Sequence, residues 1–215
     1  MSLQQKLAAI KAAFEASAPK EALAVMHDAT RMLIDSGQAE KALKAGQPAP
    51  PFTITDADGT RQSLAALLAR GPLVLTFYRG IWCPFCNADL EALEAARGEI
   101  EARGAHLAAV SPQTAANSRK TIEKLSLGFP LLNDDGGELA ALFGLRWSLP
   151  DDLRKLYTGF GVDLAVFNGN SAWTLPMPAR YVIDTSGMIV YSEVNPDYTH
   201  RPDPDVLLPV LDRLR

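Results

Sequence analysis

The first 45 residues carry apolar side chains at the spacing of an α-helix. Four of these residues are separated by four, three and four positions, which places them on one face of a helix that ends near residues 17–19. They are Leu3, Leu7, Ile10 and Phe14. A second helix with a mixed face follows at Leu23, Met26, Thr30 and Leu33, and Gly37 is a plausible stop. The pattern predicts a helical extension over residues 1–45, which either covers the rest of the chain or joins two subunits as a homodimer.

From Gly46 onward the pattern changes to short apolar runs that alternate with helical segments. Strands are expected at residues 52–55, 73–78, 106–110, 129–132, 181–183 and 188–191. Helices are expected at residues 64–68, 114–125, 138–143 and 206–211, and from the cysteine pair through Leu90, Leu93 and Ile100. Residues 184–187, Asp-Thr-Ser-Gly, favour a hairpin between the last two strands. The order of elements predicts an α/β domain over residues 46–215, with a mixed central sheet and helices on both faces.

Composition narrows the class of protein. The 215 residues are 47% hydrophobic, which is enough to build the core of one domain with an extension. The net charge is −4 and there is no basic run, so nucleic acid and anionic membrane surfaces are poor candidate partners. Residues 1–10 lack an unbroken apolar stretch, and no apolar run approaches the length of a membrane span. We expect a cytoplasmic protein.

The two cysteines of the chain, Cys83 and Cys86, lie between the expected strand 73–78 and a helical pattern. A C-x-x-C motif between strand and helix is typical of the redox site of a thioredoxin-like βαβ unit. At a helix N-terminus, free backbone N–H groups and the helix dipole would favour the thiolate of Cys83, and Pro84 suits the first turn. Cys86, one turn later, would be within reach for a disulfide. The spacing therefore predicts that Cys83 attacks and Cys86 resolves.

Other uses of this cysteine pair are less favoured by the sequence. A zinc site needs further ligands, but there is no second C-x-x-C, and His27, His106 and His200 are scattered. A structural disulfide closing so small a loop would restrain little of the unfolded chain. Residues 134–137 lack the remaining oxygen ligands of a calcium loop, and Ser111 lacks the G-x-S-x-G motif of a hydrolase. No metal and no cofactor are expected.

A thiolate at Cys83 needs electrostatic stabilisation beyond that of the helix dipole. Lowering a thiol pKa from about 8.5 to about 7 takes roughly 2 kcal/mol, whereas a helix dipole supplies about 0.3 to 1 kcal/mol. Arg79 and Arg180 are candidate cations that could also orient a peroxide oxygen or an acidic substrate group, although both could equally be solvated arginines at strand ends. Trp82 could shield the sulfurs as an apolar wall or simply pack in the core.

Several segments resemble the peroxiredoxin family, the alkyl hydroperoxide reductase and thiol-specific antioxidant group of the thioredoxin-like superfamily. They are Gly-Gln-Pro-Ala-Pro-Pro-Phe-Thr at 46–53, Phe-Pro-Leu-Leu-Asn-Asp at 129–134 and Tyr-Val-Ile-Asp-Thr-Ser-Gly at 181–187. Trp-Cys-Pro-Phe-Cys-Asn at 82–87, the N-terminal helices and Asp-Tyr-Thr-His-Arg-Pro at 197–202 are similar to a branch of that family with a C-x-x-C motif.

This resemblance implies a thioredoxin-like fold and a thiol-dependent peroxidase that reduces hydrogen peroxide or organic hydroperoxides. Cys83 and Cys86 would cycle between dithiol and disulfide, and an external thiol donor such as thioredoxin or glutathione would restore them. Two alternatives remain open, namely a general thiol-disulfide oxidoreductase acting on protein disulfides and a redox-sensing module.

The sequence also departs from the family pattern. Typical peroxiredoxins have a Thr or Ser three residues before the reactive cysteine and a Pro seven before, whereas Gly80 and Thr76 occupy those positions here. The family's second Arg would fall at Pro178, with Arg180 two residues later. Thioredoxin-like oxidoreductases resemble one another in a cis-Pro beside the dithiol, so we expect Met177–Pro178 to be cis and Pro178 to present backbone to the substrate. The aromatic insertion 147–175 could line a substrate cleft, form an interface or cover the core.

Overall fold

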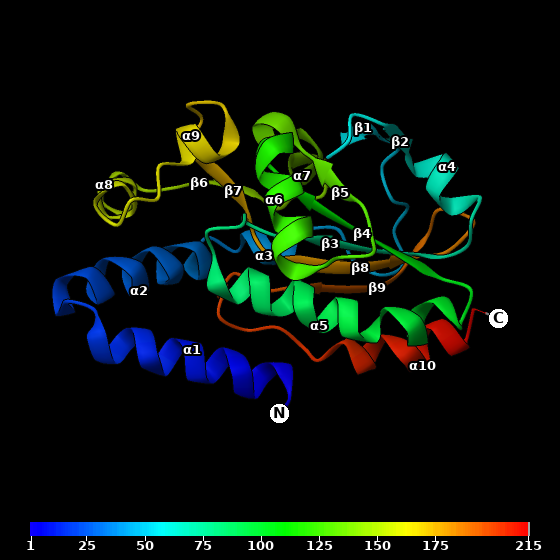
Figure 1. Ribbon diagram of the computed structural model, residues 1–215, viewed down its shortest axis with the longest axis horizontal. Helices are drawn as coiled ribbons and strands as arrows, with labels where there is room; N and C mark the ends of the chain where they lie inside the picture. The colour runs from blue at the N-terminus through cyan, green and yellow to red at the C-terminus, as the bar shows by residue number, and fades with distance from the viewer. Residues whose placement is uncertain (215) are drawn as a thin grey trace.

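A mixed seven-stranded sheet forms the centre of the computed structural model, which describes residues 1–214 (Figure 1). The strand order is β2-β1-β5-β4-β3-β8-β9. The strands are β1 Thr53–Asp56, β2 Arg61–Ser63, β3 Leu73–Phe77, β4 His106–Ser111, β5 Leu131–Asn133, β8 Ala179–Ile183 and β9 Ile189–Val194. Strands β3, β4 and β5 are parallel, whereas β8 is antiparallel to β3 and β9 to β8. This arrangement confirms the predicted mixed α/β sheet.

Helices cover both faces of the sheet. They include α4 Leu64–Leu68, α5 Pro84–Glu101, α6 Ala115–Leu125, α7 Glu138–Leu142 and α10 Leu208–Asp212, with short 3-10 turns at Asp135–Gly137 and Pro204–Leu207. Every residue of β3 is buried, and alternate side chains of a strand point to opposite faces. Val74 joins the hydrophobic cluster beneath α5, while Leu75 and Phe77 join the cluster beneath α4 and α7. Burial on both faces explains why this strand is a continuous apolar run in the sequence.

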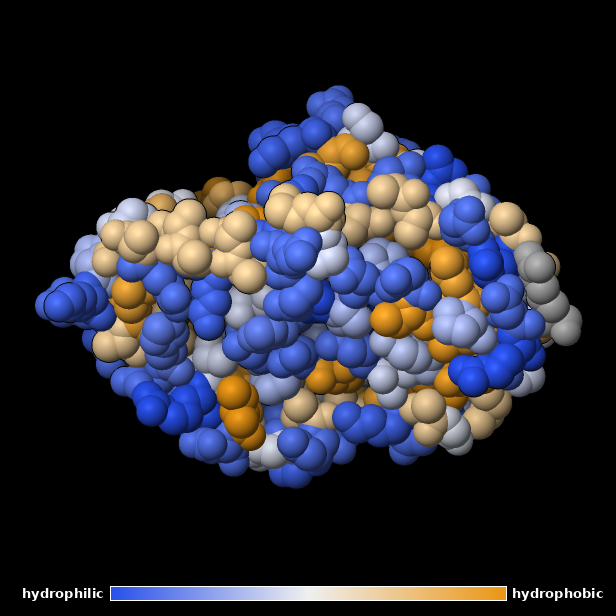
Figure 2. All heavy atoms as spheres, turned by 90° about the horizontal axis from the view of Figure 1, so that it is seen from below, coloured by the Kyte–Doolittle hydropathy of each residue, from blue (hydrophilic) through white to orange (hydrophobic). Residues whose placement is uncertain are grey.

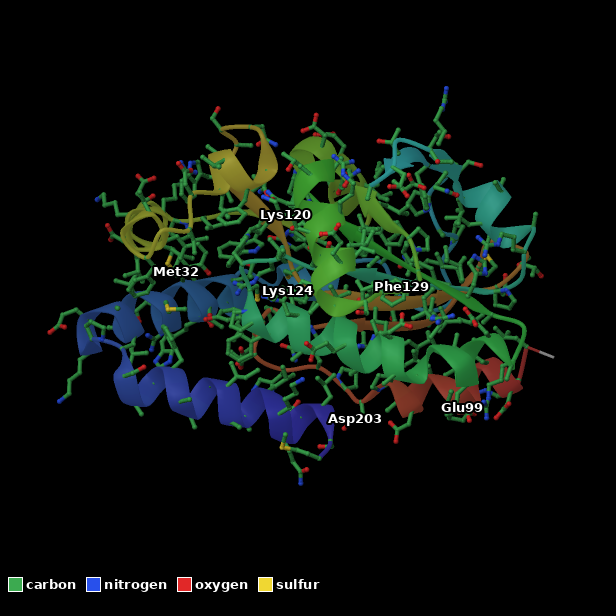
Figure 3. All side chains as sticks on the ribbon, in the orientation of Figure 1. Met32, Glu99, Lys120, Lys124, Phe129 and Asp203 are labelled. Carbon is green, nitrogen blue, oxygen red and sulfur yellow. The ribbon has the colours of Figure 1, made fainter. Side chains whose placement is uncertain are left out.

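The N-terminal helices pack against the rest of the same chain. They are α1 Leu3–Ser17, α2 Lys20–Asp35 and the short α3 Gln38–Lys41. Leu3 and Leu7 are buried in the cluster that contains α5, and Asp203 accepts a hydrogen bond from the backbone N–H of Leu3 (Figure 3). The predicted boundaries of the first two helices are confirmed, and α1 and α2 form a hairpin beside the domain (Figure 1).

The surface seen from below carries its most hydrophobic residues in separate small groups between hydrophilic ones (Figure 2). This view does not test homodimer formation through the N-terminal helices, which stays a prediction. Within residues 1–214, no helix is both long and apolar enough to cross a membrane.

The aromatic insertion folds into elements that the sequence pattern did not predict. They are β6 Arg146–Ser148, α8 Asp151–Gly159, α9 Leu164–Asn168 and β7 Thr174–Pro176, with β6 and β7 paired as a separate two-stranded sheet. Helix α8 packs against α2, and Tyr157 and Leu153 share a buried cluster with Ala29. The short elements α3 and β2 were also missed, because segments of three or four residues are too short to show a period.

The prediction of a cis bond at Met177–Pro178 was wrong. No peptide bond in the described part of the chain is cis. The backbone runs extended from β7 into β8, and the N–H of Met177 donates to the carbonyl of Leu145 at 2.9 Å. An extended run needs no tight turn at this proline, and a trans bond is the ordinary geometry there.

Candidate active site

The cysteine pair lies where the central strand passes into the longest helix. Strand β3 ends at Phe77, and Cys83 is the N-cap residue of α5, with Pro84 in the first turn. Pro84 begins the helix at little cost, because the first N–H groups of a helix have no intrahelical partner. Both cysteines are free thiols and neither side chain is exposed to solvent. The predicted position of Cys83 at a helix N-terminus is thus confirmed.

The side chain of Arg79 contacts the sulfur of Cys83. Its Nη2 donates a hydrogen bond to Cys83 Sγ at 3.2 Å, and its Nη1 donates to the hydroxyl of Tyr157 at 3.0 Å. The guanidinium carbon lies 3.7 Å from the ring centroid of Tyr198 and 4.9 Å from that of Trp82. Arg79 is only 4% exposed, and among the described residues its Nε has no hydrogen-bond partner. The guanidinium therefore contacts four neighbouring side chains, and of its three nitrogens only Nε has no hydrogen-bond partner among the described residues.

The surroundings of the two thiols shift their pKa values in opposite directions. Burial alone would raise the pKa of Cys83, but hydrogen bonding from Cys86 and the charge and hydrogen bond of Arg79 hold that pKa well below the ordinary thiol value. The pKa of Cys86 is raised well above its ordinary value by burial and by its hydrogen bond and charge interaction with Cys83, against opposing contributions from Arg201 and Arg79. These opposite shifts favour ionisation of Cys83 before Cys86, the order that the predicted roles require.

Arg180 takes a different position from the one expected for a substrate ligand. It is 1% exposed, and its Nη2 lies 2.5 Å from Oδ1 of Asp89 on α5. Arg201 Nε lies 3.6 Å from the other oxygen of the same carboxylate. The structure thus brings Arg79 and Trp82 to Cys83, whereas Arg180 joins a buried ion pair.

Gly80 occupies the position at which typical members of the family have a Thr or Ser hydroxyl, and its surroundings leave no room for a side chain. Its φ is 147°, and a Cβ added there would lie 2.6 Å from Trp82 Nε1. A threonine could not occupy this position unless the indole moved. Pro178 precedes β8, whose first residue Ala179 pairs with Phe77 at the end of β3, but Pro178 does not line the pockets next to Arg79.

An apolar pocket of about 140 Å³ is lined by Arg79, Trp82 and Pro84, the neighbours of the buried Cys83. Its lining comes from α1 and α2, from the turn around Cys83, from the end of the insertion and from the loop after β9. The residues are Ile10, Phe14, Met26, Arg79, Trp82, Pro84, Phe85, Tyr157, Phe160, Val162 and Tyr198.

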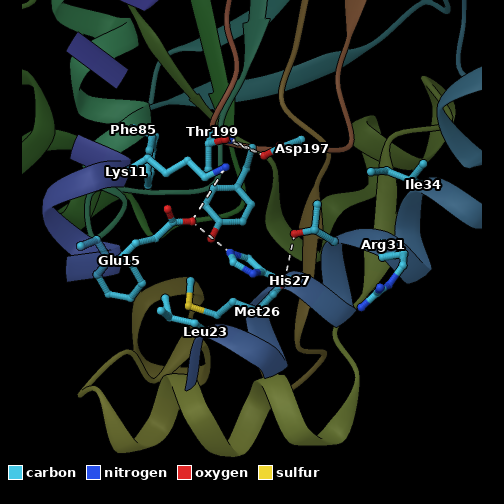
Figure 4. Close-up of a pocket in the computed structure, with 13 residues that line it drawn as sticks. Lys11, Glu15, Leu23, Met26, His27, Arg31, Ile34, Phe85, Asp197 and Thr199 are labelled. Carbon is cyan, nitrogen blue, oxygen red and sulfur yellow. Dashed lines mark hydrogen bonds and ion pairs between the residues drawn. The ribbon is translucent and has the colours of Figure 1, made fainter. Parts of the chain in front are cut away.

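A second pocket of about 150 Å³ lies on the other side of four of these residues, namely Phe14, Met26, Phe85 and Tyr198 (Figure 4). Its lining includes the charged side chains of Lys11, Glu15, Arg31 and Asp197, and Glu15 accepts a hydrogen bond from His27 at 3.1 Å. No group of three or more potential metal ligands occurs in residues 1–214.

Sequence reasoning did not single out Tyr157, Tyr198 or Asp89 as site residues. Tyr157 lies 78 residues after Arg79 on α8, and Asp89 lies 91 residues before Arg180. Contacts between residues so far apart cannot be recognised from the spacing of residues along the sequence. The signals that could have found them were the aromatic richness of the insertion and the Asp-Tyr-Thr-His-Arg-Pro segment at 197–202.

Comparisons with known proteins agree with this geometry. The model of the AhpC/TSA family matches residues 45–192. A chloroplastic peroxiredoxin Q of Oryza sativa subsp. japonica is 30% identical over 146 residues, which cover 68% of this chain and 57% of that protein. A chloroplastic peroxiredoxin Q of Triticum aestivum is 29% identical over 174 residues, covering 81% of this chain and 70% of that one. The alignment with the rice protein thus spans less than two thirds of its length.

Solved structures share the fold. The crystal structure of peroxidoxin BcpB from Mycobacterium tuberculosis superposes with a TM-score of 0.64 at 24% identity, covering 80% of this chain and 99% of that one. A structure of Xanthomonas campestris peroxiredoxin Q gives a TM-score of 0.58 at 18% identity, covering 75% and 90%. The predicted thioredoxin-like fold is therefore confirmed.

Proposed function

This chain belongs to the AhpC/TSA family, and we propose that it is a thiol-dependent peroxidase that reduces hydrogen peroxide or organic hydroperoxides through Cys83 and Cys86. One observation carries the proposal, the hydrogen bond from Arg79 to Cys83 Sγ at 3.2 Å. It places a buried positive charge beside the sulfur, and such a charge favours the nucleophilic thiolate.

The reaction follows from the separated acidities of the two thiols. The thiolate of Cys83 attacks the terminal oxygen of the peroxide, the O–O bond breaks, and Cys83 becomes a sulfenic acid while the alkoxide or hydroxide leaves and takes up a proton. The sulfur of Cys86 then attacks the sulfenic sulfur, releasing water and forming the Cys83–Cys86 disulfide. An external dithiol or two thiols reduce this disulfide and are themselves oxidised.

Arg79 has two parts in this scheme. It stabilises the thiolate before the attack, and we propose that its Nε–H, which is buried without a partner among the described residues, donates to a peroxide oxygen. The hydroxyl of Tyr157 accepts from the same guanidinium, and burial raises its pKa, so the phenol keeps its proton at neutral pH. These groups take the place of the family's hydroxyl donor, which Gly80 cannot supply.

We propose a thiol of the thioredoxin or glutathione type as the electron donor. The disulfide must be reopened after each turnover, so the protein needs a compartment that maintains such donors, and the cytoplasm is one.

A general thiol-disulfide oxidoreductase is the second candidate. The observation in its favour is the C-x-x-C dithiol at the start of α5, together with the absence of a hydroxyl at Gly80. The same thiolate would then attack a disulfide sulfur, giving a mixed disulfide that Cys86 resolves.

The two functions are separated by timing oxidation of the reduced protein. Hydrogen peroxide, tert-butyl hydroperoxide and a protein disulfide are mixed separately with wild type, Cys83→Ser and Cys86→Ser, and the sulfur products are identified by mass spectrometry. We expect either peroxide to oxidise wild type far faster than it oxidises free cysteine. Cys86→Ser should stop at the sulfenic acid of Cys83, and Cys83→Ser should not react.

Peroxide oxidation no faster than that of a free thiol would overturn the peroxidase proposal. Rapid formation of a mixed disulfide in Cys86→Ser, without rapid sulfenic acid formation, would favour the second candidate. Reaction of Cys83→Ser but not of Cys86→Ser would reverse the assignment of nucleophile and resolving thiol.

A further inference from the structure

The loop after β4 lies against the turn that carries the reactive cysteine. Strands β3 and β4 are parallel neighbours, so the segments that follow them leave the sheet at the same edge (Figure 1). One segment contains the turn 80–83, in which the N–H of Cys83 donates to the carbonyl of Gly80 at 3.1 Å. The other contains Gln113, which lies between β4 and α6 and is 1% exposed. The sheet therefore brings Gln113 to the turn, although the two lie far apart in the sequence.

The side-chain amide of Gln113 links this turn to a buried polar network. Its Oε1 accepts a hydrogen bond from the backbone N–H of Ile81 at 2.9 Å. Its Nε2 donates to the hydroxyl of Tyr78 at 2.9 Å and lies 3.0 Å and 3.3 Å from the hydroxyls of Thr121 and Ser118. A backbone N–H can only donate, so a flipped amide would place two donors against each other at Ile81. The hydrogen bonds on both sides therefore fix the orientation of the amide.

Ile81 is held from its other side by α5. Its carbonyl accepts a hydrogen bond from Nδ2 of Asn87 at 2.8 Å, and the N–H of Asn87 donates to the carbonyl of Cys83 at 3.1 Å. The preceding residue, Gly80, has a φ of 147°, and glycine has the widest backbone freedom of any residue. The side chains of Gln113 and Asn87 therefore restrict a turn that its own glycine leaves free.

The shape of this turn sets the position of the sulfur relative to Arg79. Arg79 directly precedes the turn, and its Nη2 donates to Cys83 Sγ at 3.2 Å. The guanidinium has its own contacts outside the turn, because it donates to the hydroxyl of Tyr157 and lies over the ring of Tyr198. A shift of the turn would thus move the sulfur away from the guanidinium. Since a hydrogen bond weakens steeply when its geometry is lost, the thiolate would lose stabilisation.

We infer that Gln113 is a positioning residue: through Ile81 it holds the turn 80–83 so that Cys83 Sγ stays within hydrogen-bond distance of Arg79. The hydrogen bonds of its amide go to Ile81 and to the polar network, so it acts on the sulfur only through the backbone. The inference rests on the proposed role of Cys83 as nucleophile. It applies to both candidate functions, because each begins from the same thiolate.

The test follows the ionisation of Cys83 by the ultraviolet absorbance of its thiolate as the pH is changed, with Cys83→Ser as the blank. Absorbance reports ionisation of a buried sulfur without the need for a reagent to reach it. Gln113→Met keeps the length of the side chain but has no N–H donor and only a weak acceptor. Asn87→Leu removes the other partner of Ile81 at a half-buried position. Thr121→Val is the matched control, because it removes one hydroxyl of the network and leaves the hydrogen bond to Ile81 in place.

We expect Gln113→Met to lower the ionisation constant of Cys83 about tenfold, because the turn no longer holds the sulfur at the guanidinium. Asn87→Leu should change the ionisation constant in the same direction. Thr121→Val should leave it as in wild type, although it destabilises the fold. The free energy of unfolding of all three variants is measured by urea denaturation, so that an effect on the thiol can be told from an effect on the fold.

An ionisation constant of Cys83 that Gln113→Met leaves unchanged would overturn this inference alone. If Gln113→Met does not fold, Asn87→Leu decides, and an unchanged constant there has the same meaning. An equal change in Thr121→Val would also overturn it, because loss of stability would then explain the effect. A wild-type Cys83 no more acidic than free cysteine would instead contradict the proposed thiolate, and the proposed function would fail with it. The wild-type titration therefore distinguishes the two failures.

Discussion

Arg79 donates from Nη2 to the sulfur of Cys83 across 3.2 Å, and both side chains are buried. Arg79 lies four residues before Cys83 and two residues after the end of β3, so the strand and the start of α5 together set the distance. In a buried environment this contact is much stronger than the same pair would be in water. The low pKa of the Cys83 thiol therefore depends on Arg79 together with the hydrogen bond from Cys86.

Arg79→Gln should raise the pKa of Cys83, because it removes the positive charge and shortens the donor. We expect alkylation of Cys83 at pH 7 to slow about tenfold or more. A thiol with a lowered pKa stays ionised as the pH falls through 7, so the wild-type rate should change little between pH 9 and 7. The variant should lose rate over that interval. Rates are measured with iodoacetamide, and the modified cysteine is identified by peptide mass.

The control for that experiment is Arg97→Gln, which removes a surface guanidinium paired with Glu94 and Glu101. Its pH profile should match that of wild type. An identical profile for Arg79→Gln would mean that Arg79 does not set the acidity of Cys83.

Tyr157→Phe should destabilise the protein, because it leaves the Nη1 of buried Arg79 without its acceptor. We expect a loss of about 1 to 2 kcal/mol in the free energy of unfolding, measured by urea denaturation at pH 7. Tyr181→Phe is the matched control, since the hydroxyl of Tyr181 is buried and has no hydrogen-bond partner in residues 1–214. That variant should be neutral or slightly stabilising. Equal losses for the two variants would show that the hydrogen bond to Arg79 contributes nothing.

Asp89→Asn should be among the most destabilising single changes in this chain. The carboxylate neutralises two buried guanidinium groups, those of Arg180 at 2.5 Å and Arg201 at 3.6 Å. Removing one partner of a buried ion pair typically costs about 3 to 5 kcal/mol. Glu91→Gln on the same helix, half-exposed and paired with Lys6, should cost less than about 1 kcal/mol. A loss at Asp89 no larger than at Glu91 would contradict the importance of the buried pair; both are measured by urea denaturation.

His106 should make the fold sensitive to mild acid. Burial is the main reason that its pKa is lowered to about 4, with a smaller contribution from Arg70 against that of Glu101, and neither ring nitrogen has a partner in the part of the chain described. A histidine whose pKa is lowered in the folded state stabilises the fold only while its ring is neutral. Its contribution to the free energy of unfolding is therefore complete above pH 6.5 and is lost as the pH falls toward 4.

Between pH 7 and pH 4, the free energy of unfolding of the wild type should therefore fall by about 2 to 3 kcal/mol more than that of His106→Leu. Thermal unfolding followed by circular dichroism across that range provides the measurement. His200→Leu, which changes a histidine whose side chain is 50% exposed, should follow the wild-type curve. Parallel curves for wild type and His106→Leu would contradict the prediction.

The sequence determined the features that depend on near neighbours. Hydrophobic spacing gave α1, α2 and the central strand β3 to within a few residues, since each element needs its apolar side chains at its own period. The position of Cys83 as N-cap of α5 followed from the strand before it and Pro84 after it. The roles predicted for the two cysteines rest on the same local arrangement, a thiol at a helix start and a second thiol one turn later, and they stay predictions.

Only the tertiary structure decided which distant side chains surround that dithiol. Arg79 and Arg180 were both candidate cations for the site in the sequence, yet in the structure Arg79 donates to Cys83 and Arg180 pairs with Asp89. Tyr157 reaches the site from an insertion, and the helical hairpin, which packs against that insertion, completes an apolar pocket. The chain also passes through Met177–Pro178 in the ordinary trans form. These outcomes depend on how charges and apolar surfaces far apart in the chain are buried together, and no spacing along the chain records that choice.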